Sequence, residues 1–134
     1  MGLDMHVFQT SEDNLIDNKQ FNDKDVVDVK KLEKVWYWRG HPRLHKWFEK
    51  LYLEKGGKCE EFNGEYVKLT IEDINKLEKV LRKDKLPINN GFPNGCFFDE
   101  YVSYYDTYNR DKKFIRKARD ILKDNNCLIY SSFW

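Results

Sequence analysis

Hydrophobic and polar residues alternate at both ends of the chain, and this alternation predicts one strand at each end. In residues 3–8, apolar side chains occupy the odd positions, whereas Asp4 and His6 fall on the other side of the extended backbone. The segment 127–134 is short, apolar and aromatic, which is also typical of a strand. We therefore expect the two terminal strands to pair as the core of a small sheet.

Between these strands, apolar residues recur at the spacing of amphipathic helices. The most regular segment covers residues 71–84, and Thr70 with Asp73 resembles the capping arrangement that begins a helix. Residues 65–69 predict a short extended piece, and the Pro- and Gly-rich residues 86–95 predict a long loop. Four or five helices are expected in all, over residues 23–38, 42–55, 71–84, 98–108 and 109–123.

Gly40, His41 and Pro42 interrupt the helical pattern most sharply. Glycine suits the position just after a helix, and proline suits the first turn of the next one. Proline also disfavours the α conformation for the residue before it. The sequence therefore predicts that two helices meet here in a corner, with tryptophans on both sides of it.

The order of these elements predicts an α+β fold, in which a small sheet of the N- and C-terminal strands is covered by four or five helices. With 134 residues, the chain is expected to form a single domain over 1–134. Hydrophobic residues make up 40% of the chain, and nine Phe, eight Tyr and four Trp supply much of that share. Large rings fill a core, but Tyr and Trp are also favoured on recognition surfaces, so both roles are open.

Charge and cysteine content exclude several classes of protein. The net charge is +1, and 24 basic and 23 acidic residues alternate along the predicted helices, so we do not expect duplex nucleic acid as a partner. Three widely spaced cysteines without a secretory signal indicate free thiols in the cytoplasm. No zinc-ligand spacing, phosphate-binding loop or long apolar run is present, so we expect no metal, no cofactor and no membrane span.

Several short motifs follow one another along the whole chain. They are Met1-Gly2-Leu3-Asp4-Met5, Tyr37-Trp38-Arg39, His45-Lys46-Trp47-Phe48, Leu86-Pro87, Gly95-Cys96-Phe97-Phe98, the acidic and tyrosine-rich residues 99–107, and Tyr130-Ser131-Ser132-Phe133-Trp134. In this order they resemble a family of small uncharacterised phage and prophage proteins. The chain departs from that family at Gly40-His41-Pro42, where the family more often has Lys-Ala-Asn. The resemblance implies a viral or mobile-element origin and a place in the host cytoplasm, but it supplies no reaction.

The residues best suited to chemistry form a binding constellation, not a catalytic one. Aromatic faces and arginine suit a nucleotide, and serine hydroxyls add hydrogen bonds. The same residue types equally suit a protein–protein hot spot. Arg39 and His45 are expected to face one pocket across the corner, although His45 also fits a histidine of the core. The predicted ligand-binding residues are Trp38, Arg39, His45, Trp47, Tyr104, Tyr105, Ser131 and Ser132, and no catalytic or metal-binding residue is predicted.

We therefore expect a phage-type accessory protein that acts by binding in the host cytoplasm, as a counter-defence or host-takeover factor. Its target would be a host protein or a nucleotide-derived signal, and self-association into a homo-oligomer is left open. The alternative is a small phosphoester-directed hydrolase that uses His45 with an acidic partner.

Overall fold

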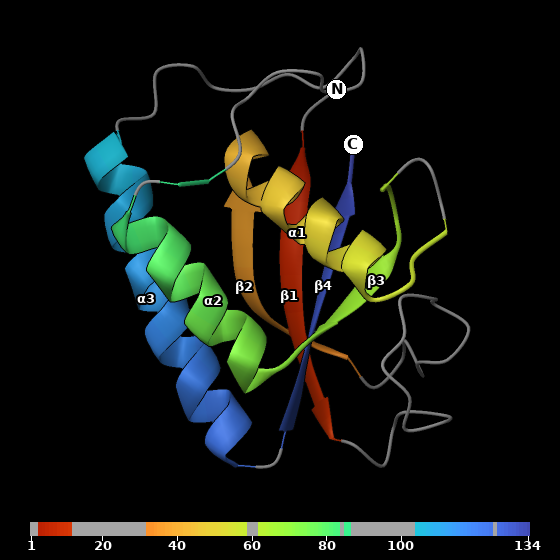
Figure 1. Cartoon of the computed structure of the whole chain (residues 1–134). Coiled ribbons are helices and arrows are strands. Elements are labelled where there is room, and N and C mark those ends of the chain that lie inside the picture. Colours follow the sequence, from red (N-terminus) through yellow and green to blue (C-terminus); the bar gives the residue numbers. More distant parts are fainter. Residues whose placement is uncertain (1–2, 12–31, 59–61, 84, 87–103, 125) are drawn as a thin grey trace.

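Four strands and three helices make up the part of the chain that the structure describes. This computed structural model describes residues 3–11, 32–58, 62–83, 85–86, 104–124 and 126–134 (Figure 1). The elements follow in the order β1 (Asp4–Ser11), β2 (Glu33–Arg39), α1 (Pro42–Glu54), β3 (Tyr66–Leu69), α2 (Ile71–Arg82), α3 (Tyr104–Lys123) and β4 (Asn126–Phe133).

The four strands form one antiparallel sheet in the order β2-β1-β4-β3. β1 pairs with β4 along its whole length, from Asp4 opposite Phe133 to Ser11 opposite Asn126. This pairing confirms that the two terminal strands form the centre of the sheet, and it confirms the α+β class. The short extended piece expected over residues 65–69 is also confirmed, as β3.

The helices lie on one side of the sheet, and a large core fills the space between the two layers (Figure 1). Met5 and Val7 of β1 and Leu128 and Tyr130 of β4 belong to this core. Many of the rings stack inside it: those of Phe48 and Tyr130 lie 3.8 Å apart at their centroids. The helices contribute Leu44, Phe48, Leu51 and Tyr52 from α1, Ile74, Leu77 and Leu81 from α2, and Phe114, Ile115 and Ala118 from α3.

The helix expected over residues 23–38 is wrong for the part that the structure describes, because Glu33–Arg39 is strand β2. The run Val-Trp-Tyr-Trp at residues 35–38 is β-branched and aromatic, which favours a pleated sheet surface. Pairing with β1 puts Trp38 opposite Met5 and buries its ring. A local helical pattern does not encode this contact, since the two strands meet only in the folded chain.

The corner of two helices expected at Gly40 is wrong as well, because a strand enters it. Gly40 has a φ of 70°, which favours glycine, and its N–H donates to the Leu3 carbonyl at 2.9 Å. Pro42 is the first residue of α1, where its fixed φ suits a helix, and His41 precedes it outside the helical region. The junction therefore joins β2 directly to α1.

Three helices, not four or five, occupy the described part of the chain. α2 begins as predicted: the Thr70 hydroxyl accepts from the Asp73 N–H, and the Asp73 carboxylate accepts from the Thr70 N–H. α3 is unbroken along its whole length, so the boundary expected near residue 109 is wrong. Residues 98–103 of the expected tyrosine-lined helix, and most of the loop 86–95, lie outside the described residues.

Candidate functional site

The sheet separates the predicted ligand-binding residues instead of gathering them in one pocket. Side chains alternate along β2, so Trp38 points into the core while Arg39 is exposed on the opposite face. Ser131 and Ser132 are neighbours on β4, so their side chains likewise point to opposite faces of the sheet, and both are buried. Arg39 therefore does not share a pocket with His45, which lies in the core beneath α1.

The other predicted aromatic residues belong to helices. Trp47 of α1 is partly buried, and its ring packs edge-on against Phe48 with the centroids 5.3 Å apart. Tyr104 and Tyr105 begin α3, but their side chains lie outside the described residues.

His45 is a core histidine with a defined hydrogen-bond partner. It is 2% exposed, and its Nδ1 lies 2.7 Å from the Tyr130 hydroxyl oxygen. Burial lowers the pKa of His45 to about 4, so the imidazole is neutral at pH 7. Burial raises the pKa of Tyr130 well above its usual value, which keeps the hydroxyl protonated, and Ser132 hydrogen-bonds to that oxygen. The three side chains hold α1 against β4, and a ligand contact of His45 stays a prediction.

A buried carboxylate on α3, that of Asp111, ties this helix to the junction between β2 and α1. Asp111 is 1% exposed; it accepts from Trp38 Nε1 at 3.0 Å, and its other oxygen lies 2.8 Å from His41 Nε2. Each carboxylate oxygen thus has a partner, as burial of a charge requires. Among the described residues, the acidic side chain that pairs with a histidine is therefore Asp111, and the histidine is His41. No sequence spacing indicates this pair, since Asp111 and His41 are 70 residues apart.

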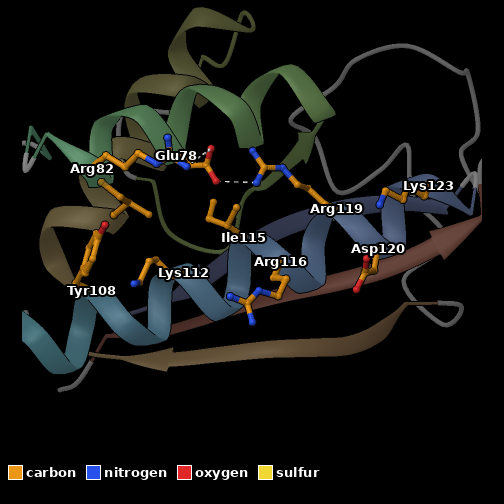
Figure 2. Close-up of a pocket in the computed structure, with 10 residues that line it drawn as sticks. Glu78, Arg82, Tyr108, Lys112, Ile115, Arg116, Arg119, Asp120 and Lys123 are labelled. Carbon is orange, nitrogen blue, oxygen red and sulfur yellow. Dashed lines mark hydrogen bonds and ion pairs between the residues drawn. The ribbon is translucent and has the colours of Figure 1, made fainter.

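A groove of about 280 Å³ opens where α2 and α3 pack side by side, and charged side chains make up most of its lining (Figure 2). Five of its side chains are Arg or Lys, whereas only Glu78 and Asp120 are acidic. The lining residues are Glu78, Leu81, Arg82, Tyr108, Lys112, Ile115, Arg116, Arg119, Asp120 and Lys123. The groove is therefore basic, although the chain as a whole is nearly neutral.

One arginine of the groove is held in place from both helices. Arg119 donates from Nη1 to Glu78 Oε2 at 2.7 Å and from Nη2 to Asn75 Oδ1 at 2.9 Å, and Figure 2 shows the first of these contacts crossing between α3 and α2. This hydrogen bond lowers the pKa of Glu78 and raises the pKa of Arg119, so both stay charged. Arg82 lies 3.6 Å from the other Glu78 oxygen and is 70% exposed. One carboxylate is thus shared by two arginines.

Three further cations of the groove form no ion pair within the described ranges: Lys112, Arg116 and Lys123. The ammonium of Lys112 lies 4.7 Å from the centroid of the Tyr108 ring. Because these cations repel one another along one face of α3, an anion bound among them would be stabilised.

The sequence-based binding constellation includes none of the charged residues of the groove, because alternating charge along a helix indicates a solvated face. One signal could have found them. Lys112, Arg116, Arg119 and Lys123 follow one another at three- and four-residue spacing, which places them on one helical face. The sequence could not show that this face lies beside α2.

No protein-family model, curated protein or solved structure matches the chain. The resemblance to small phage proteins therefore stays a prediction. Within the described ranges, no three His, Cys, Asp or Glu side chains are grouped to hold a metal ion. The helices of the same ranges include none that is long and apolar enough to cross a membrane.

Proposed function

We propose that the protein acts by binding, and that its ligand carries phosphate groups, as a nucleotide-derived signal does. The observation that carries this proposal is the groove between α2 and α3, where Lys112, Arg116 and Lys123 lack carboxylate partners among the described residues. Guanidinium and ammonium groups bind phosphate oxygens through charge-assisted hydrogen bonds. Tyr108 adds an aromatic ring to the same lining.

The dimensions of the groove favour a small ligand over a protein surface. Its volume of about 280 Å³ lies just below the range for small-molecule sites, which begins at roughly 300 Å³. The phosphate-bearing part of a small ligand fits such a volume, whereas a protein partner buries a far larger and flatter area. The resemblance to phage proteins agrees with a role in binding. A counter-defence factor that sequesters a nucleotide signal needs affinity for the signal but does not need to convert it.

The buried pair of His41 and Asp111 favours a second candidate, a phosphoester-directed hydrolase. A carboxylate that fixes one imidazole nitrogen leaves the other available for proton transfer. In this second candidate, His41 and Asp111 would have the role that the sequence-based alternative gives to His45 and an acidic partner. Binding remains the first proposal, since Asp111 also accepts from Trp38 and is thereby committed to the core.

Isothermal titration calorimetry and thermal unfolding with ADP, ATP and inorganic pyrophosphate test the first proposal. A ligand present at about 100 times its Kd raises the free energy of unfolding by about 2.7 kcal/mol, which raises the Tm by several degrees. Replacing two unpaired cations together (Arg116→Ala with Lys123→Ala) should weaken binding at least about tenfold, because two charge-assisted contacts are lost. The matched control is Lys113→Ala with Lys117→Ala, which removes the same charge from exposed positions of α3 outside the groove.

Chromatography of the ligand after incubation separates the two candidates. An intact ligand supports binding, and consumption that stops in His41→Ala would replace the first candidate by the hydrolase. The groove is not the site if the control pair weakens binding as much as the groove pair. The absence of any Tm shift with all three phosphate compounds would reject the proposal.

A further inference from the structure

The face of the sheet opposite the helices carries a cluster of four rings, of which two are exposed and two are half-buried. Tyr37 is 39% exposed and Phe133 is 52% exposed. His6 contacts both of them, with ring centroids 5.1 Å from Tyr37 and 6.5 Å from Phe133, and Phe8 lies 5.9 Å from His6. We call His6, Phe8, Tyr37 and Phe133 the aromatic face. Grouped exposed rings of this kind mark interaction surfaces more often than isolated ones do.

Strand pairing explains why these residues meet. Tyr37 of β2, His6 of β1, Ser131 of β4 and Tyr66 of β3 stand directly opposite one another in a single row across the sheet. Alternation along each strand then adds Phe8 and Phe133 to the same side. The four rings of the aromatic face therefore come from the three strands β1, β2 and β4, and no single stretch of sequence contains them.

Two polar atoms in this row have no hydrogen-bond partner. Ser131 is fully buried and its Oγ is unpaired, and the buried Nδ1 of His6 is unpaired as well. Burial, and then the charge of Lys34, lower the pKa of His6, so its imidazole is neutral at pH 7 and presents one donor and one acceptor. Buried polar atoms are almost always paired in folded proteins. An unpaired hydroxyl and an unpaired imidazole nitrogen therefore lie beneath the exposed rings.

Cations flank the aromatic face at both ends of β2. Arg39 stands opposite Asp4, and Lys34 stands opposite Phe8, and both cations are exposed. The carboxylate of Asp4 accepts from the Tyr37 hydroxyl at 2.5 Å, so it is already engaged by a neutral donor. Two exposed cations and one carboxylate thus lie beside the rings, so positive charge exceeds negative charge by one among these residues, which favours an anionic partner.

We propose that the aromatic face binds single-stranded nucleic acid, with bases stacked on the exposed rings and phosphates beside Lys34 and Arg39. Bases of every kind stack on aromatic side chains, and their polar edges can pair with an imidazole. A duplex keeps its bases stacked on one another, so it cannot use these rings. A second copy of the same face would bring further cations to this surface, which disfavours self-association. This surface is independent of the groove between α2 and α3.

Fluorescence anisotropy with labelled oligo-dT and oligo-U, and a hairpin duplex for comparison, tests this proposal. Phe133→Ala should weaken single-strand binding by about five- to a hundredfold, which is the usual effect of losing one stacked base. Leu53→Ala is the matched control, since Leu53 is 53% exposed on α1, outside the aromatic face. Tyr37→Phe should keep the affinity and Tyr37→Ala should lose it. With two phosphate contacts, the slope of log K against log salt should be near −1.4, roughly 0.7 per contact.

Each other outcome overturns the proposal. The aromatic face is not the site if single strands do not bind saturably, if the duplex binds as well as they do, or if Leu53→Ala weakens binding as much as Phe133→Ala. Loss of binding only in the variant with Arg116→Ala and Lys123→Ala would assign the oligonucleotide to the groove. Sedimentation equilibrium adds the last test: a wild-type dimer that Phe133→Ala dissociates would make a second copy the occupant.

Discussion

The imidazole of His45 is buried in the core and neutral at pH 7. In the unfolded chain a histidine has a pKa near 6.5, and burial lowers the pKa of His45 to about 4 in the folded state. Below about pH 6.5 the unfolded chain therefore binds more protons than the folded chain. The stability that comes from the neutral imidazole is fully present above that pH and is lost as the pH falls through about 4.

Urea unfolding at pH 7 and pH 5 measures this contribution. Between these two values we expect His45 to lower the free energy of unfolding by about 2 kcal/mol, from the difference between its two pKa values. His45→Gln should flatten the pH dependence, because the buried titrating group is gone. His6→Gln is the control and should leave most of the dependence in place. An unchanged dependence in His45→Gln would show that His45 does not titrate as a buried neutral group.

His45 also shows how far a single residue can be predicted. Its neighbours Leu44 and Phe48 are apolar at helical spacing, so the sequence predicts either a place in the core or a place facing a pocket. Its partner could not be predicted, because Tyr130 is 85 residues away and meets it only across the core. The same reason applies to Asp111, which pairs with Trp38 and His41 from another layer.

At the scale of elements, a buried ion pair joins the end of α1 to the start of α2. Lys55 Nζ lies 2.5 Å from Asp73 Oδ2 and donates to the Lys68 carbonyl at 2.5 Å, and the two charged side chains are only 8% and 7% exposed. Lys55 caps α1, and Asp73 belongs to the capping box that begins α2 with Thr70. Two helix ends and the edge strand β3 therefore depend on one pair of charges.

Lys55→Met should lower the free energy of unfolding by about 3–5 kcal/mol, because it leaves the Asp73 carboxylate buried without its cation. Adding Asp73→Asn should recover part of this loss, since the uncompensated charge is then removed. Lys50→Met, at an exposed position of α1, should change stability by no more than about 0.5 kcal/mol. Chemical denaturation measures all of these variants. A loss in Lys55→Met no larger than in Lys50→Met would show that the pair contributes no net stability.

Elements with an unambiguous local signal could be predicted, whereas β2, whose pattern fits both a helix and a strand, could not. α2 has both an apolar stripe and a capping box, so its start and course follow from neighbouring residues. β2 contains apolar residues at spacings that also fit a helix, and only its register with β1 decides the matter. The aromatic face could not be predicted for the same reason, because its residues come from the three strands β1, β2 and β4. The groove requires the side-by-side packing of α2 and α3, which no helix encodes alone.

At the scale of the whole molecule, the sheet divides two unlike surfaces. Helices α2 and α3 hold the basic groove on one side, whereas the aromatic face lies on the other side of the same strands. The layer between them is a closely packed core that includes Tyr130 and Phe114. Net charge is nearly zero, so neither surface follows from a general excess of cations. The two surfaces are therefore separate features, each of which needs its own explanation.

Independence of the two surfaces can be measured directly. With the groove saturated by pyrophosphate, the affinity of oligo-dT for the aromatic face should change by less than about twofold, because distant sites without shared contacts are usually additive. Phe133→Ala and the pair Arg116→Ala with Lys123→Ala should likewise affect only their own ligands. Competition between pyrophosphate and oligo-dT would instead mean that both use one basic site. Mutual strengthening would require a free-energy coupling through the sheet, in which each ligand raises the affinity of the other by the same factor.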